Sequence, residues 1–483
     1  MSMLRCVAPA TGRVSKDRTM SGTRQPLPIM QPAKVRAPEM VRDPEWWVAP
    51  IRWSALAVWL SIPAFALLAQ PYAGRIVWTV AVASLPLFIV LVGYHRWRRI
   101  CPLAFINQIP VRLLRPGTRR MPPWVEEHHQ YIPLALFVAG LWLRLIATNG
   151  DGAAIAAFFV ALSLVALVFG AIFTGKSWCQ YVCPVSFIEK IYTEPHGLRE
   201  TRNSQCTKCT ACKTACPDIN QENSYWKELG SRSKRVAYFA YPGLVFGFYF
   251  YYFLQSGTWD YYFSGDWTNE PGLLATAFLP GHDAGTAGFA FLPAVPRALA
   301  SLLTLGACAA ASYLLFSRLE PLVEHWRRAR GAPADPRRAR HLTFALAAFA
   351  AFVTFYSFAG QPTLRKLPWL PTYVGIVVVA TATFTLSRRL RRTQDDFAEE
   401  GLARAIVKRW QWPDSQPPTS LHDAYLIHQG RSREHAQAYE QVLETYQAYQ
   451  GEQFHRTRSV LLPSQPLHVD RQEDVLQHRA PGE

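Results

Sequence analysis

The sequence predicts an all-α polytopic membrane protein of about eight transmembrane helices that carries a small cysteine-rich insert. Two observations predict the helices. Half of the 483 residues are hydrophobic, and they form long apolar runs that alternate with short, strongly charged segments. Such runs approach the roughly 20 residues that a helix needs to cross a bilayer. We expect spans near residues 51–70, 75–95, 130–148, 153–174, 236–255, 297–316, 342–359 and 371–387.

The positions of the basic residues predict how these helices are oriented. Lysine and arginine are frequent in the segment before the first span and in four alternate loops, at 96–120, 176–235, 318–340 and 388–392. The stretch 256–296 has neither residue. Because basic loops stay on the cytoplasmic side, we expect both termini and the four basic loops in the cytoplasm of a cell with this protein in its inner (plasma) membrane. The net charge of +17 then reflects topology, and no nucleic-acid-binding motif accompanies it.

These patterns divide the chain into five parts. Residues 1–45 are polar and rich in proline, and we expect a disordered cytoplasmic tail. Residues 46–195 form a transmembrane unit of four helices, and 236–392 hold four further helices with a periplasmic loop at 256–296. Between them lies a cytoplasmic cysteine-rich segment, 196–235. Residues 393–483 are expected to form a soluble cytoplasmic helical tail without a catalytic motif.

The cysteine-rich segment contains four cysteines in one short run, C-x2-C-x2-C-x3-C-P, made by Cys206, Cys209, Cys212, Cys216 and Pro217. This is the spacing of bacterial ferredoxins that bind a [4Fe–4S] cluster, since closely spaced thiolates on a tight loop reach several irons of one cube. Structural zinc more often uses two C-x2-C pairs separated by a dozen or more residues. We therefore expect a small ferredoxin-like 4Fe–4S insert in which these four cysteines bind one cluster.

A second group of cysteines lies where the predicted spans end. Cys179 and Cys183-Pro184 form C-x3-C-P after the fourth span, and Cys101-Pro102 follows the second span. Residues 101–106 also align with 183–188, which predicts a tandem repeat of helical hairpins. In this alignment Trp97 stands where the second copy has Cys179.

The repeat would bring Cys101, Cys179 and Cys183 together at the cytoplasmic edge of the membrane. Three thiolates do not complete an all-cysteine cube, and the seven motif cysteines cannot fill two such cubes. Two interpretations stay open for these residues: a second iron–sulfur or metal site, or structural thiols that close helix ends.

These motifs resemble the membrane-bound polyferredoxin family, which includes the nitrous-oxide-reductase regulatory protein and the quinol-dehydrogenase subunit of periplasmic nitrate reductase. The resemblance covers roughly residues 50–255. It implies a multi-pass inner-membrane protein that moves electrons between the quinone pool or a cytoplasmic donor and a partner protein. The chain departs from the family pattern in having one ferredoxin run and in the reduction of one C-x3-C-P motif to Cys101-Pro102.

We therefore expect an electron-transfer component rather than a stand-alone enzyme, with no catalytic side chain of its own, because protein groups tune an iron–sulfur centre and do not perform its redox chemistry. Its expected contacts are membrane lipid and a redox partner protein or quinone. Two other classes stay open: a redox or oxygen sensor, and a maturation factor for another metalloenzyme. The sequence does not specify an oligomeric state.

Overall fold

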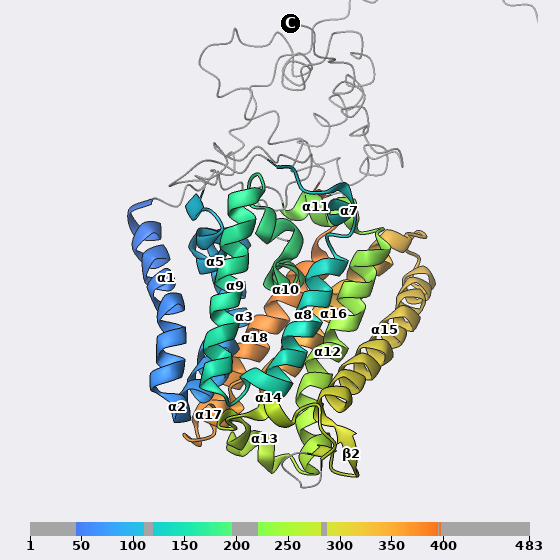
Figure 1. Ribbon diagram of the computed structural model, residues 1–483. Coiled ribbons are helices and arrows are strands. Elements are labelled where there is room, and N and C mark those ends of the chain that lie inside the picture. Colours follow the sequence, from blue (N-terminus) through green and yellow to red (C-terminus); the bar gives the residue numbers. More distant parts are fainter. Residues whose placement is uncertain (1–44, 111–118, 196–220, 282–286, 395, 398–483) are drawn as a thin grey trace, which may run out of the picture. The chain divides into compact units, whose positions relative to one another are not determined.

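The computed structural model describes residues 45–110, 119–195, 221–281, 287–394 and 396–397. These residues are mostly helical, and their long helices run up and down side by side (Figure 1). The expected N-terminal tail, the ferredoxin-type run at 206–217 and the expected C-terminal tail from residue 398 lie outside the described residues.

The first half of the described chain holds two pairs of long helices, each followed by short helices. Its elements are α1 (Glu45–Leu68), α2 (Gln70–Arg75), the π-helix η1 (Ile76–Ala81), α3 (Val82–Val92), α4 (Tyr94–Ile100), α5 (Pro102–Ile106), α7 (Pro123–Glu127), α8 (Tyr131–Leu143), the π-helix η2 (Arg144–Thr148), α9 (Gly152–Ile172), the π-helix η3 (Trp178–Val182) and α10 (Pro184–Thr193).

The second half adds four long helices and a folded connection between the first two of them. Its elements are α11 (Gln221–Glu228), α12 (Arg232–Ser256), α13 (Asp260–Ser264), the 3-10 helix η5 (Asp266–Thr268), α14 (Leu273–Thr276), β1 (Ala287–Phe289), β2 (Leu292–Pro296), α15 (Arg297–Ala329), α16 (Pro336–Phe358), α17 (Gln361–Leu364) and α18 (Leu370–Arg391).

Seven helical stretches among the described residues are long and apolar enough to cross a membrane. They are Trp46–Leu68, Gln70–Val92, Tyr131–Thr148, Gly152–Ile172, Arg297–Ala329, Pro336–Leu364 and Leu370–Arg391. Each corresponds to one of the expected spans, so the chain has the helices of a multi-pass membrane protein. The eighth expected span, 236–255, is the helix α12, which is rich in tyrosine and falls short of the same test. The count of eight therefore stays a prediction.

The helices place the described basic segments at one end. Figure 1 shows α5, α7 and α11 at one end, and α2, α13, α14 and α17 at the other. Two long-range hydrogen bonds bring later basic segments to the first end. Arg340 Nη1 donates to the backbone oxygen of Leu229, 3.4 Å away, and Arg392 Nε donates to Glu222 Oε1 at 2.7 Å. We call this the cysteine end, because α5, which begins directly after Cys101, lies on this side and Cys179 and Cys183 belong to the same apolar cluster as Cys101.

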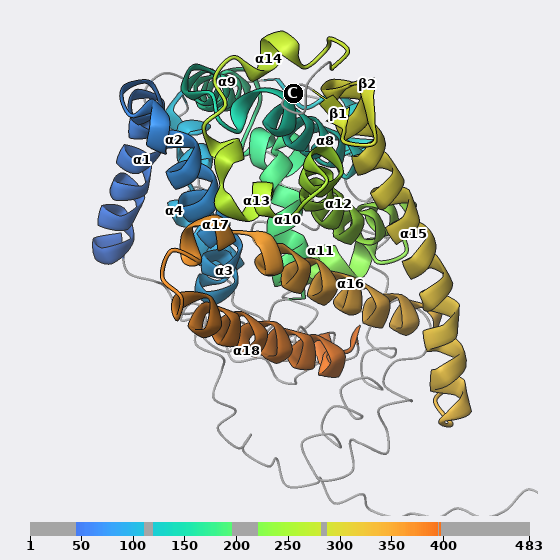
Figure 2. The ribbon, with the colours of Figure 1, turned by 90° about the horizontal axis from the view of Figure 1, so that it is seen from below.

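The connection at 256–296 is folded, whereas the sequence suggested only a loop. It contains α13, η5, α14 and an antiparallel β1–β2 hairpin, so the described fold departs from the expected all-α class by two short strands. Tyr262 Oη donates to the backbone oxygen of Phe358, and the Gly272 amide donates to Asp151 Oδ2, at 2.9 and 2.8 Å. These bonds fasten the connection across the end opposite the cysteines (Figure 2).

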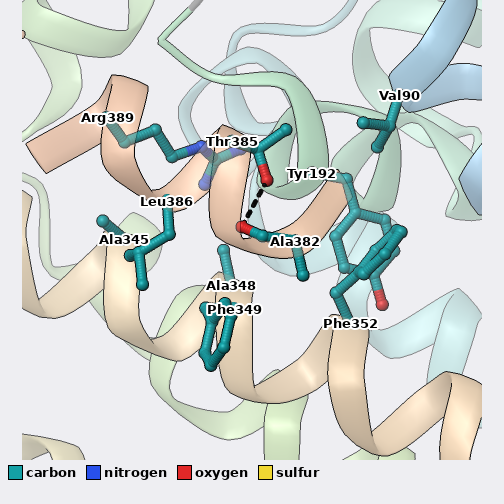
Figure 3. A pocket seen from close by; sticks show the side chains of 10 residues that line it. All are labelled: Val90, Tyr192, Ala345, Ala348, Phe349, Phe352, Ala382, Thr385, Leu386 and Arg389. Atoms are coloured by element: carbon teal, nitrogen blue, oxygen red, sulfur yellow. Dashed lines mark hydrogen bonds between the residues drawn. The ribbon is translucent and has the colours of Figure 1, made fainter. Parts of the chain in front are cut away.

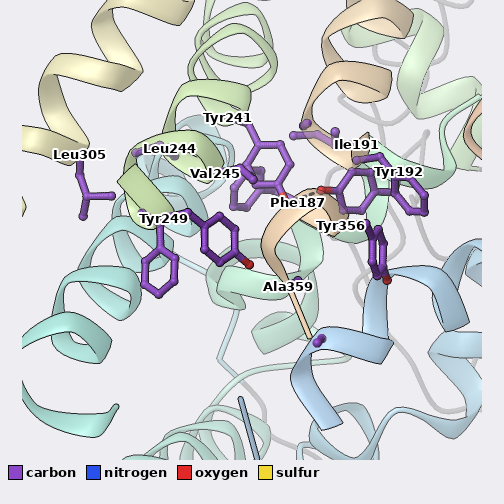
Figure 4. Packing of buried hydrophobic residues seen from close by; sticks show 14 of the residues in the cluster. Phe187, Ile191, Tyr192, Tyr241, Leu244, Val245, Tyr249, Leu305, Tyr356 and Ala359 are labelled. Atoms are coloured by element: carbon purple, nitrogen blue, oxygen red, sulfur yellow. Dashed lines mark hydrogen bonds between the residues drawn. The ribbon is translucent and has the colours of Figure 1, made fainter. Parts of the chain in front are cut away.

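The helix α10, which begins directly after Cys183, packs into the largest apolar core of the described residues. Phe187 and Tyr192 of α10 meet Tyr241 of α12, with ring centroids 5.5 and 5.7 Å apart, and Tyr241 Oη donates to Tyr192 Oη at 2.9 Å (Figure 4). This core fixes the direction of α10 and therefore the position of the cysteine at its start.

Candidate metal centre

Two helix starts of the same construction carry Cys101 and Cys183. Each cysteine immediately precedes a helix whose first residue is proline, and the backbone angles agree closely: φ and ψ are −56° and 123° at Cys101, and −55° and 118° at Cys183. Proline suits this first position, because its fixed φ is helical and it has no amide hydrogen to satisfy. The Cys-Pro pairs of the two aligned segments thus present their thiols at equivalent points, the starts of α5 and α10.

The turns that lead into these starts differ by one residue. The Cys101 amide donates to the backbone oxygen of Trp97, four residues earlier, at 2.8 Å. The Cys183 amide donates to that of Trp178, five residues earlier, also at 2.8 Å, because η3 is a π-helix. If the two segments are aligned by these hydrogen bonds, Trp97 corresponds to Trp178. Cys179 is then a residue of the wider turn η3. Single π-turns inside helices are frequent at functional sites.

Each of the two Cys-Pro helices contacts the other copy of the repeat: α5 is bound to α9, and α10 is bound to α4. The side-chain amide of Asn107, just after α5, donates to the backbone oxygen of Ala166 in α9 at 2.9 Å. The approach is close at Gly170, where a Cβ atom would lie 1.7 Å from the backbone oxygen of Asn107. In the other direction Glu189 of α10 accepts a 2.6 Å hydrogen bond from Trp97 Nε1 of α4. These crossed contacts hold the two helix starts next to each other.

The three thiols are buried and influence one another electrostatically. Cys101, Cys179 and Cys183 are 8%, 2% and 4% exposed and belong to one apolar cluster. Burial, followed by the charges of Glu189 and Cys179, raises the pKa of Cys101 to about 12. Burial, followed by Cys179, Glu189 and Cys101, raises the pKa of Cys183 well above its ordinary value. Burial thus favours the neutral thiol over the thiolate at both Cys101 and Cys183.

Buried positive charges accompany the thiols along the chain. Arg98 and Arg99 precede Cys101, Lys176 precedes Cys179, and Lys190 follows Glu189, and all four side chains are buried. The guanidinium of Arg98 favours the thiolate of Cys101, but burial and the charges of Glu189 and Cys179 outweigh it, so the pKa of this thiol is raised. Buried charges are costly unless opposite charges balance them. Arg98 has such a partner in Glu189, whose Oε2 lies 3.6 Å from Arg98 Nη1.

The donors of this site fit an iron–sulfur cluster by type, since thiolates are the usual cluster ligands. The indole Nε1 of Trp178, next to Cys179, is buried without a hydrogen-bond partner among the described residues and could donate to a sulfur atom. However, no three cysteine, histidine or carboxylate side chains of the described part form a group that could hold a metal ion as they stand. The chemistry fits a cluster, and the described residues alone do not complete its ligand set.

The four cysteines expected to bind the main cluster, Cys206, Cys209, Cys212 and Cys216, lie outside the described residues. Their assignment therefore stays a prediction. Of the two cysteines without a motif, Cys6 is also outside the described part, and Cys308 is partly buried on α15. There its Sγ faces Gly247 of α12, as expected of a thiol that only packs between helices.

One pocket was a candidate for the expected quinone. It lies between α3, α10, α16 and α18 and is lined mainly by apolar side chains, with Tyr192, Thr385 and Arg389 as its polar members (Figure 3). Its volume is about 260 Å³, its open mouth included. Ligand pockets for molecules of drug size measure about 300–1,000 Å³. The pocket therefore gives no support to a quinone site.

Sequence reasoning missed two features of this centre. One is the wider turn η3, although the sequence signals it: Trp97 precedes Cys101 by four residues and Trp178 precedes Cys183 by five. The other is Glu189, whose role depends on a long-range contact with Trp97 that no local pattern reveals.

Comparison with known proteins supports the metal chemistry at this place in the chain. No curated protein and no solved structure matches the chain. A family of 4Fe-4S binding domains (Fer4_5) matches residues 156–195, which comprise most of α9, the turn η3 and α10. The match contains Cys179 and Cys183 and ends before the ferredoxin-type run. The 4Fe-4S binding domain at residues 156–195 supports an iron–sulfur protein, and Cys179 and Cys183 are the cysteines within the matched residues.

Proposed function

We propose that this protein is an iron–sulfur electron-transfer protein of a bacterial inner membrane, which passes electrons between the quinone pool or a cytoplasmic donor and a partner protein. One observation carries the proposal. The residues that match a 4Fe-4S binding domain include two buried cysteines, and both follow a helix, Gly152–Ile172, that is long and apolar enough to cross a membrane.

Two groups of cysteines would hold the iron. Cys206, Cys209, Cys212 and Cys216 have the spacing for one [4Fe–4S] cluster, and Cys101, Cys179 and Cys183 would contribute to a second iron–sulfur or metal site. When bound, such a cluster exchanges one electron at a time, at a potential set by cluster charge, hydrogen bonds to sulfur and solvent exposure. The remaining ligand of the second site would come from outside the three thiols.

The chain's own residues prepare the second site in three ways. The two proline-started helices orient the thiols of Cys101 and Cys183, and the turn η3 adds Cys179. Apolar neighbours exclude water, which protects a cluster from hydrolysis and oxidation. Buried arginine and lysine side chains offset the negative charge of a thiolate-bound cluster.

The distribution of charge supports the proposed orientation. The described basic segments gather at the cysteine end, and the stretch 256–296 at the opposite end has no lysine or arginine. The positive-inside rule then favours the cytoplasmic side for the cysteines, a reducing compartment in which thiolates persist.

The test is anaerobic purification from membranes, with iron and acid-labile sulfide counted and the reduced protein examined by EPR. Cys209→Ala and Cys183→Ala remove one cysteine from each group, and Cys308→Ala is the matched control, because Cys308 lies outside both groups. We expect iron, sulfide and a reversible EPR signal in wild type and in Cys308→Ala, and a loss of iron in each of the other variants. Iron-free or zinc-bound wild-type protein contradicts the proposal, as does a cluster that cannot be reduced and reoxidised.

A further inference from the structure

Glu189 is a buried carboxylate placed between the two Cys-Pro helix starts. It lies on α10, six residues after Cys183, and is 1% exposed. Its Oε1 accepts the 2.6 Å hydrogen bond from Trp97 Nε1, and its Oε2 lies 3.6 Å from Arg98 Nη1, whose side chain is also buried. A fully buried carboxylate is uncommon in proteins, and this one has both a hydrogen-bond donor and a cation beside it.

The contacts of Glu189 join the approaches to both helix starts. Trp97 and Arg98 lie in the last turns of α4, directly before Cys101, whereas Glu189 is in the second turn of the helix that Cys183 starts. In the aligned segment of the first copy, Asn107 takes the place of Glu189 and binds a backbone oxygen of α9. The first copy is therefore neutral where the second is charged.

The carboxylate of Glu189 lies close to both helix starts in the network of hydrogen bonds. Its partner Trp97 also accepts, through its backbone oxygen, the 2.8 Å hydrogen bond from the Cys101 amide, and Glu189 itself lies on the helix that Cys183 starts. A negative charge beside a cluster disfavours the extra electron of the reduced state. Net charge near the irons is one of the factors that set cluster potentials.

We propose that Glu189 is the positioning residue of this metal centre: through Trp97 it fixes Cys101 relative to Cys183, and its charge lowers the midpoint potential of a cluster bound there. This inference rests on the proposed function, because it requires a cluster on Cys101, Cys179 and Cys183. It goes further in assigning the control of geometry and potential to a residue that is not a ligand.

The first test separates charge from shape. Glu189→Gln keeps the size of the side chain and an oxygen for Trp97 Nε1, but it removes the charge. We expect the iron content of wild type and a midpoint potential shifted upward in an anaerobic redox titration followed by EPR. Glu320→Gln is the matched control, because Glu320 is also buried and paired with arginines but lies on α15. A Glu189→Gln potential equal to those of wild type and Glu320→Gln overturns the charge role.

The second test addresses geometry. Glu189→Ala and Trp97→Phe both break the bond between the two copies, and we expect each to lose iron and to broaden the EPR signal, whereas Glu189→Gln retains both. The melting temperature of the iron-free protein gives a readout without the cluster: we expect it to fall in Glu189→Ala and to change little in Glu189→Gln. Full iron content and an unchanged spectrum in both Glu189→Ala and Trp97→Phe overturn the positioning role.

Failure of this inference differs from failure of the proposed function. An EPR signal that disappears in Cys183→Ala but keeps its potential in Glu189→Gln overturns the charge role alone. A signal that persists unchanged in Cys183→Ala shows that no cluster depends on this site and overturns the whole inference, whereas the proposed function fails only if the wild-type protein lacks a reversible cluster.

Discussion

The two Cys-Pro segments have nearly the same backbone at the cysteine and different turns before it. At Cys101 the preceding turn is α-helical and ends in a four-residue hydrogen bond to Trp97; at Cys183 it is a π-turn that ends in a five-residue bond to Trp178. Because of the additional residue, the second copy has Trp178 as the acceptor of the Cys183 amide, as Trp97 is for Cys101, and also has Cys179 in the same turn. One inserted residue in a turn therefore separates a copy with one thiol from a copy with two.

The copies also differ on the C-terminal side of the cysteine. α5 ends after five residues, and Asn107 then binds the backbone of α9 through a neutral amide. α10 continues for ten residues, carries the charged Glu189 and ends next to Glu194, which forms a buried ion pair with Lys234 of α12 at 3.2 Å. The comparison indicates that the first copy mainly supplies a docking surface and the second supplies most of the site's chemistry.

Removing the additional residue should have the largest effect. Deletion of Gln180 turns C-x3-C into C-x2-C and takes away the residue that η3 needs, so Cys179 should no longer lie beside Cys183. We expect iron bound at this site to be lost, as in Cys183→Ala, measured by iron analysis and EPR. Gln180→Ala keeps the register and is the matched control, with iron content near wild type. Equal iron content in the deletion variant and this control would show that the π-turn is not needed.

Introducing a second cysteine before Cys101, to copy the C-x3-C-P motif of the second segment, should not create a further metal ligand. Trp97→Cys restores C-x3-C before Pro102 in sequence, but the turn there is α-helical, and Trp97 is buried and bound to Glu189. Replacing a buried tryptophan by a small residue costs about 3–5 kcal/mol. We expect a lower melting temperature and no gain in iron per chain. A gain in iron would show that sequence spacing alone defines the site.

The docking of the first copy on α9 can be disturbed at Gly170. A Cβ atom there would meet the backbone oxygen of Asn107 at 1.7 Å, so Gly170→Ala must push α5 and Cys101 away. Overpacking of this kind costs about 1–3 kcal/mol, which thermal unfolding in detergent would detect. Gly140→Ala is the control, because no atom lies within 4 Å of its Cβ position, and it should leave stability unchanged or slightly higher. Similar melting temperatures for the two variants would contradict the close approach.

The sequence predicted the long helices well because span length and loop charge are local properties. It also drew attention to Cys101, Cys179 and Cys183, since a Cys-Pro pair at the end of an apolar run is visible without a structure, and their role as metal ligands stays a prediction. It could not find the contacts of Glu189 with Trp97 or of Gly170 with Asn107, because the partners are 92 and 63 residues apart along the chain. The folded connection at 256–296 was missed for a similar reason, as its short helices are fixed by bonds to distant residues such as Asp151.

The last difference between the copies is the group of ion pairs at the end of α10, and low pH should weaken it. Glu194 binds Lys234, which lies 3.7 Å from Glu228, and Glu228 in turn contacts His129 at 3.1 Å. Burial alone would raise the pKa of Glu228, but the hydrogen bond from His129 and the charge of Lys234 outweigh it and lower this pKa from 4.5 to about 2.

A carboxylate with a lowered pKa stabilises the fold at pH values above its unfolded pKa, and this stabilisation is lost as the pH falls from about 4.5 towards 2. Between pH 4.5 and 3 the loss is at most about 2 kcal/mol. We expect the melting temperature of wild type to fall more steeply over this range than that of Glu228→Gln, which has no charge to lose. Parallel curves for the two proteins would show that Glu228 does not hold this end. The corresponding contact after α5 is made by the neutral amide of Asn107, which does not titrate. Low pH should therefore destabilise the packing at the end of α10 before that of α5.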